Sequence, residues 1–145
     1  MSLIARLTLI AFVELLRTSV AARSADLLLY GGRSHDEFIG CISCNKFDSG
    51  SVCNKFGDQG SKFSDKSIWN KFADYGSKFS DVSPWNKFAS YPPVIVDRDG
   101  KFYGYFTANK FSTDRTTIPA FVSILDNVDW VTDDYDRARD TICGD

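Results

Sequence analysis

The sequence predicts an α+β, loop-rich fold: stacked 16-residue aromatic repeats of turns and short strands, one β-hairpin and C-terminal helices. Three observations predict it: a Lys-Phe pair that recurs at alternating steps, a Pro-Pro-Val segment before a turn sequence, and apolar residues at helical spacing near the end. A chain of 145 residues suits one modest domain. We expect this domain over residues 23–145, with repeats at 41–91, a hairpin at 92–111 and a helical end at 117–145.

Residues 1–22 have the features of a secretory signal peptide. A basic opening precedes an apolar run over residues 7–16, and the small residues Val20 and Ala22 are placed for cleavage. The alternative is an amphipathic first helix that stays in the fold, and Glu14 inside the apolar run favours it. No later stretch approaches the roughly 18 apolar residues of a membrane span. We therefore expect a secreted protein, periplasmic or extracellular, with no membrane partner after cleavage.

The repeat is built on lysine, because eight of the nine lysines directly precede a phenylalanine. A longer and a shorter step alternate between the first six pairs, so each repeat unit holds two pairs. Asp, Ser and Gly between the pairs predict turns, with glycine supplying positive φ. We expect short extended pieces with Phe inward and Lys toward water. Stacked units would then bury two rows of rings, one of Phe56, Phe72 and Phe88 and one of Phe63 and Phe79.

The cysteines form an even set, which is typical of two disulfides in an exported chain of this size. They are Cys41, Cys44, Cys53 and Cys143. Sequence leaves three pairings open, and we favour Cys44 with Cys53 and Cys41 with Cys143, because the first unit resembles a cross-linked cap. The C-x-x-C spacing would also suit zinc or a redox pair, but no second ligand pair follows it. We expect no metal and no cofactor.

Residues after the repeat predict a hairpin and then helices. Val94 to Val96 and Lys101 to Ala108 flank the turn sequence Asp-Arg-Asp-Gly. The pattern Asp-x-Asp-Gly also occurs in calcium-binding loops, but Ala108 occupies the position where an EF-hand needs a carboxylate. Pro119 and the apolar residues that follow predict one helix, and Thr132 with its two following aspartates predicts the start of another. Seven aspartates within residues 126–145 are expected to form a solvated face.

The string "GCISC" followed by "NKFGDQGSKFSDKSIWNKFADYGSKFSDVSPWNKF" and "PPVIVDRDGKF" resembles a family of small, mostly bacterial exported proteins of unknown function. Repeats of that family read roughly Asn-Lys-Tyr/Phe-Gly-x-Tyr-Gly-Ser-Lys-Tyr/Phe-Ser-x-x-Ser-x-Trp/Phe-Asn, before a Pro-Pro-Val hairpin. The likeness covers about residues 40–111. It implies export and one repeat-plus-hairpin domain, and it implies no catalytic residue.

Sequence patterns of enzymes are missing from the chain. No G-x-S-x-G, H-E-x-x-H, phosphate loop or dinucleotide fingerprint is present. The single histidine, His35, is expected at the surface or at a cap. We therefore expect a non-enzymatic protein with no catalytic residue.

A binding module is the favoured function, with cell-wall or matrix polysaccharide as the expected partner. Rings with polar edges can stack on sugar faces while they hydrogen-bond hydroxyl groups. The expected ligand-binding residues are Trp69, Trp85, Tyr75, Tyr91, Tyr103 and Tyr105, although the same rings could equally form the core. An isoelectric point near 5.3 argues against nucleic acid. The alternative is a self-associating structural protein of the cell surface or of an extracellular assembly, because stacked repeats expose strand edges.

Overall fold

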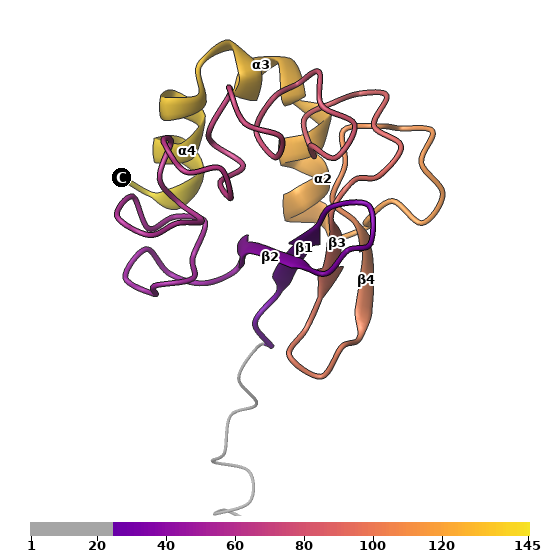
Figure 1. Ribbon diagram of the computed structural model, residues 1–145, viewed down its shortest axis with the longest axis horizontal. Helices are drawn as coiled ribbons and strands as arrows, with labels where there is room; N and C mark the ends of the chain where they lie inside the picture. The colour runs from indigo at the N-terminus through magenta and orange to yellow at the C-terminus, as the bar shows by residue number, and fades with distance from the viewer. Residues whose placement is uncertain (1–24) are drawn as a thin grey trace, which may run out of the picture.

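The computed structural model describes residues 25–145 as an antiparallel sheet, a long series of turns and three short helices (Figure 1). The predicted signal peptide, residues 1–22, lies outside the described residues. The α+β, loop-rich class and the C-terminal helices are confirmed. The elements are β1 (Leu28–Gly31), β2 (Glu37–Cys41), β3 (Val94–Val96), β4 (Phe102–Tyr105), α2 (Pro119–Asp126), α3 (Val128–Asp133) and α4 (Tyr135–Cys143). Among the described residues, no helix is long and apolar enough to cross a membrane.

The sheet has the order β2-β1-β3-β4 and lies at one end of the molecule, below the helices in Figure 1. The predicted hairpin is confirmed as β3 and β4, and the Asp97 carboxylate closes its turn by accepting from the backbone N–H groups of Asp99 and Lys101. β1 and β2 were not predicted. β1 pairs on its other edge with β3, so the sheet joins segments that are far apart in the sequence.

Between β2 and β3 the chain forms successive β-turns. Backbone N–H groups donate to the carbonyl three residues earlier from Asn54 to Ser51, from Gly57 to Asn54 and from Gly60 to Gly57. After one extra residue the same series resumes at Ser61 and runs to Gly76, and after a second extra residue it resumes at Ser77 and runs to Ala89. This segment contains no strand except an isolated bridge at Ser51, so the short strands predicted within each repeat were wrong.

The turn geometry decides which side chains reach solvent. Each Lys-Phe pair of this segment fills the two central positions of a turn that begins with Asn or Ser, whereas Phe102 of the pair at 101–102 begins β4. The first residue caps the turn, as when the Asn54 Oδ1 accepts from the Phe56 N–H at 3.0 Å. Because the central residues form the corner of the turn, Lys and Phe both point outward. The prediction that the phenylalanines face inward was therefore wrong, and it fails for Phe56, Phe63, Phe72, Phe79 and Phe88.

Tryptophan fills the core of this segment instead. Trp69 and Trp85 are buried, and their ring centroids lie 5.7 Å apart. Each indole N–H donates to a backbone carbonyl 17 residues earlier: Trp69 to Val52 at 2.7 Å, and Trp85 to Ile68 at 2.6 Å. The second contact repeats the first, one repeat unit further along the chain. Trp85 also packs edge-on against Phe106 of the segment after β4, which joins the turns to the rest of the core.

Two disulfides are present, as expected, but the favoured pairing was wrong. Cys41 bonds to Cys44, and Cys53 bonds to Cys143. The first bond closes the short loop at the end of β2. The second joins the turns to the end of α4, which lies beside the first turns in Figure 1. Helix packing sets this pairing, because α4 brings Cys143 to Cys53.

Candidate functional site

Three of the predicted ligand-binding rings lie in the core. Trp69, Trp85 and Tyr75 are between 1% and 6% exposed, which contradicts their predicted role as rings that stack on a ligand. Their polar atoms are also occupied: both indoles donate to carbonyls, and the Tyr75 hydroxyl donates to the Glu37 carboxylate. Burial and the neighbouring Glu37 raise the pKa of Tyr75.

The other predicted rings are half-buried near the sheet. The Arg33 guanidinium lies 4.6 Å from the ring centroid of Tyr91, and the ring of Tyr105 lies 5.8 Å from that of His35. Tyr91 and Tyr105 thus both contact the loop between β1 and β2. The Tyr103 hydroxyl instead donates to Asp97 of the hairpin turn at 3.0 Å. The six predicted residues therefore do not form one surface.

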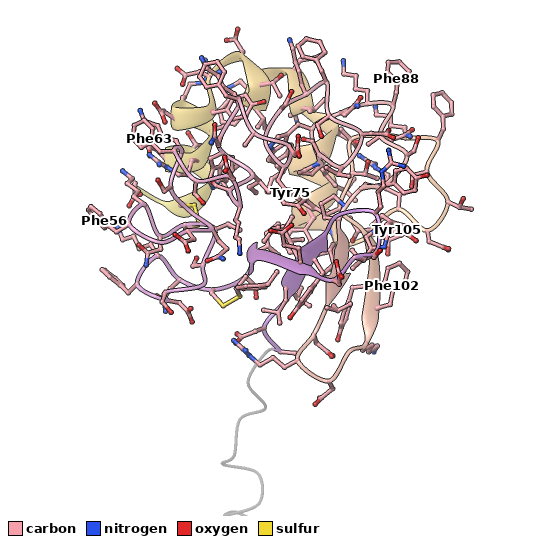
Figure 2. All side chains as sticks on the ribbon, viewed as in Figure 1. Phe56, Phe63, Tyr75, Phe88, Phe102 and Tyr105 are labelled. Atoms are coloured by element: carbon pink, nitrogen blue, oxygen red, sulfur yellow. A yellow bond between two sulfur atoms is a disulfide. The ribbon has the colours of Figure 1, made fainter. Side chains whose placement is uncertain are left out.

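The largest exposed apolar feature of the described residues is a set of rings that sequence reasoning had placed in the core. We call the seven turns with a central Lys-Phe pair the Lys-Phe turns. Their phenylalanines are between 76% and 99% exposed: Phe47, Phe56, Phe63, Phe72, Phe79, Phe88 and Phe111. The labelled rings Phe56, Phe63 and Phe88 point outward from the rim of the molecule in Figure 2. Seven exposed rings offer faces that a ligand could contact, which makes them candidates for a binding site.

Asn or Ser directly before seven of the eight Lys-Phe pairs was the signal that could have located these rings. Such residues cap turns through their own side chains, and a turn exposes both central residues. The prediction of inward phenylalanines assumed that each pair lies in an extended strand, where two neighbouring side chains point to opposite faces.

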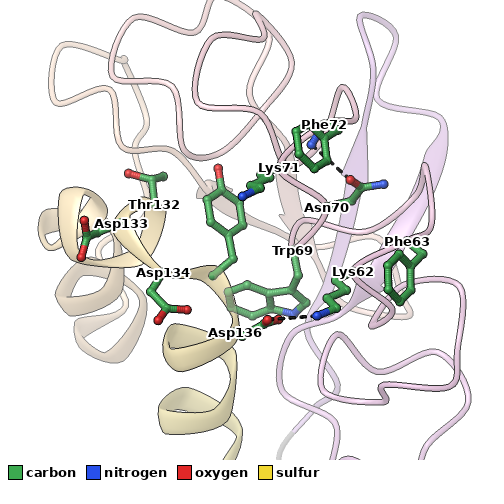
Figure 3. A pocket seen from close by; sticks show the side chains of 11 residues that line it. Lys62, Phe63, Trp69, Asn70, Lys71, Phe72, Thr132, Asp133, Asp134 and Asp136 are labelled. Atoms are coloured by element: carbon green, nitrogen blue, oxygen red, sulfur yellow. Dashed lines mark hydrogen bonds and ion pairs between the residues drawn. The ribbon is translucent and has the colours of Figure 1, made fainter.

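A cleft of about 640 Å³ opens between two Lys-Phe turns and the junction of α3 with α4, which we call cleft 1 (Figure 3). Phe63 and Phe72 line it from the side of the turns and are 82% and 87% exposed. The Lys62 ammonium group reaches across to the Asp136 carboxylate at 3.1 Å. The Lys71 ammonium lies 5.1 Å from the ring centroid of Phe72. The lining of cleft 1 thus combines two exposed rings with a Lys-Asp ion pair.

The wall of cleft 1 is held to the turns by Tyr135 of α4. Its hydroxyl donates to the carbonyl oxygen of Gly76, and burial raises the pKa of Tyr135 to about 12. Asp134 begins α4 by accepting from the Arg137 N–H, and Asp133 is exposed beside it. Of the aspartates at this junction, Asp136 pairs with a lysine of the turns, whereas Asp133 pairs with Arg137 at 3.5 Å.

Two further clefts have the same composition. Cleft 2, of about 420 Å³, lies between Phe47 and Phe56, with Asp145 bridging Lys46 at 2.8 Å and Lys55 at 3.4 Å. Cleft 3, of about 330 Å³, is lined by the Lys-Phe pairs 87–88 and 110–111, with Lys87 bonded to an Asp129 carboxylate oxygen at 2.8 Å. Four of the seven aspartates that were expected to form a solvated face pair with lysines of the repeat: Asp129, Asp136, Asp140 and Asp145.

One group of acidic and cysteine side chains in the described part of the chain has ligand atoms close enough to hold a metal ion, namely Asp26, Cys41 and Cys44. Its two sulfur atoms are bonded to each other, so neither is a thiolate ligand. Asp26 is moreover paired with Arg98 at 3.0 Å.

The fold and the clefts together define a disulfide-linked α+β protein with an exposed, repeated surface of phenylalanine and lysine. Comparison of the chain with protein-family models, curated proteins and solved structures found no match.

Proposed function

We propose that this protein is an exported, non-enzymatic binding module that holds carbohydrate in the clefts between its Lys-Phe turns. The observation that carries the proposal is the pairing of open aromatic rings with a Lys-Asp ion pair in cleft 1. A sugar ring presents apolar C–H faces and a rim of hydroxyl groups. Phe63 and Phe72 offer faces for stacking, while Lys62 and Asp136 offer a donor and an acceptor for hydroxyls.

Export is the second part of the proposal. The two disulfides support it, because such bonds persist in oxidising compartments. The signal-like sequence of residues 1–22 supports it as well. Cell-wall or matrix polysaccharide is the partner that fits this location.

The test is capture of the oxidised protein on immobilised cell-wall and matrix polysaccharides, with Phe63→Ser and Phe72→Ser combined in one variant. We expect saturable capture by the original protein and a loss of at least tenfold in the variant. The matched control is Phe79→Ser, because Phe79 is 82% exposed on an equivalent turn but lines none of the three clefts. This control should bind like the original protein.

Failure of every polysaccharide to capture the protein would overturn the carbohydrate proposal. Sedimentation of the same samples then examines the alternative function. A size that grows with concentration, and that falls when the exposed phenylalanines are replaced, would favour a self-associating structural protein.

A further inference from the structure

Clefts 1 and 2 are the same site at two positions of the repeat. The turn residues that line cleft 1 lie one repeat unit after those that line cleft 2, in the same order. Those of cleft 2 are Lys46, Phe47, Cys53, Asn54, Lys55 and Phe56, and those of cleft 1 are Lys62, Phe63, Trp69, Asn70, Lys71 and Phe72. The single change of type, Cys53 to Trp69, is at the floor, where both residues are buried. The chemistry that a ligand would meet is therefore repeated.

Each cleft also has at least one aspartate in its lining, but these aspartates come from different elements of the fold. Cleft 1 takes its carboxylates from the junction of α3 and α4, whereas cleft 2 takes Asp145 from beyond the end of α4. Cleft 3 takes Asp126 and Asp129 from the ends of α2 and α3. A Lys-Asp ion pair nevertheless stands beside two exposed phenylalanines in each case. The three sites share this arrangement although only two share the repeat.

Charge in the clefts is close to balanced. Two lysines face three aspartates in cleft 1, one aspartate in cleft 2 and two aspartates in cleft 3. A strongly anionic polymer would meet carboxylates in every cleft, and like charges disfavour binding. Hydroxyl groups can instead donate to the carboxylates and accept from the ammonium groups. The clefts therefore suit an uncharged, polyhydroxylated ligand.

We infer that the ligand is an uncharged polysaccharide chain long enough to occupy more than one cleft at once. This inference rests on the proposed function and specifies its ligand. Equivalent sites on one rigid surface gain affinity when a single chain links them, because the second contact is made at high effective concentration. A repeating polymer is the ligand for which a repeated site has this advantage.

The experiment compares a disaccharide with an octasaccharide of β-1,4-linked glucose, and in parallel of N-acetylglucosamine, by titration of the oxidised protein. Cleft 1 is disabled by Phe63→Ser with Phe72→Ser, and cleft 2 by Phe47→Ser with Phe56→Ser. Phe79→Ser is again the control. The octasaccharide should bind at least tenfold more tightly than the disaccharide, and its affinity should not change between low and high salt.

The variants separate the possible outcomes. Disabling either cleft should weaken octasaccharide binding at least tenfold. The disaccharide should lose only its binding at the disabled cleft and should keep its binding at the other. Equal losses for both lengths, or no dependence on length, would overturn the polymer inference while leaving a single-cleft binding module intact. Binding that falls steeply with salt would overturn the uncharged ligand. No binding of either length, together with no capture by the polysaccharide panel, would overturn the proposed function itself.

Discussion

Within the series of turns, phenylalanine is exposed and tryptophan is buried, which is the reverse of what hydrophobicity alone would predict. Phe56 is 99% exposed, whereas Trp85 is 1% exposed although an indole carries a polar N–H group. Position within the turn explains the difference. Phe56 occupies a turn corner, while Trp85 follows Ser83 and Pro84 on a stretch that returns to the core, where the Ile68 carbonyl satisfies its N–H. The position of a residue within the turn thus decides whether its side chain is exposed or buried.

Replacing Trp85 by alanine should therefore destabilise the protein strongly. The change removes a ring that contacts Trp69 and Phe106 and leaves a cavity, which for large aromatic residues costs about 3 to 5 kcal/mol. Chemical denaturation measures the loss. Phe88→Ala, on a nearby exposed corner, should change stability by about 0.5 kcal/mol or less. A similar loss in both variants would contradict this assignment of core and surface.

Gly60 and Gly76 recur in the repeat because the backbone packs closely there, and not because of the expected positive φ. Gly60 and Gly76 do not have positive φ, but a Cβ at either would collide with the backbone carbonyl of Asn54 or Asn70. The turns are packed against each other at these points, so a side chain has no room. The Asn70 side-chain amide also donates to the Ser64 carbonyl at 3.1 Å, and this hydrogen bond joins neighbouring turns.

The buried hydroxyl of Tyr135 is one of the contacts that attach helix α4 to the turns, and it should make stability depend on pH. The pKa of Tyr135 is raised to about 12 in the folded protein from 10.0 in the unfolded chain, chiefly by burial. The folded state therefore keeps this proton at a pH where the unfolded state loses it. Its contribution should be complete below about pH 10 and should be lost as the pH rises from about 10 to about 12.

Denaturant midpoints measured from neutral pH to pH 11 test this expectation. Tyr135→Phe should lower stability by about 1 kcal/mol near neutral pH, because the hydrogen bond to Gly76 is lost, and it should reduce the alkaline decline. Phe79→Ser should retain the decline of the original protein. An unchanged alkaline decline in Tyr135→Phe would show that this hydroxyl is not the group responsible.

At the scale of the whole molecule, the C-terminal helices pack against the series of turns and hold it in place. Four lysines of the Lys-Phe turns pair with aspartates of the helical end, at 3.4 Å or less: Lys46, Lys55, Lys62 and Lys87. These groups are partly exposed, and ion pairs of this kind contribute little each. The Cys53–Cys143 disulfide is the covalent part of the same closure and spans 90 residues of sequence.

Removing that disulfide should cost more than removing the other. The chain-entropy model assigns about 4 to 5 kcal/mol to a loop of this length and about 1.5 to 2 kcal/mol to the three-residue separation of Cys41 and Cys44. Chemical denaturation of Cys53→Ser with Cys143→Ser, and of Cys41→Ser with Cys44→Ser, compares them. Equal losses would mean that the long disulfide does not act mainly by restricting the unfolded chain.

Local patterns in the sequence determined the elements that depend on neighbouring residues. The Asp-Arg-Asp-Gly turn places β3 beside β4, Pro119 starts α2, and Asp134 caps α4, each within a few residues of its cause. The period of the repeat was visible for the same reason, since it is written in the order of Asn, Lys, Phe and Gly. Such features need no knowledge of distant contacts.

Tertiary structure alone decided which rings are buried, how the cysteines pair and where the candidate site lies. β1 pairs with β3 although the whole series of turns separates them in the sequence, and Cys53 meets Cys143 only because α4 packs beside the first turns. Clefts 1 to 3 likewise join repeat lysines to aspartates of the helical end. Their partners come from separate parts of the chain, and the packing energy that selects them has no local signature.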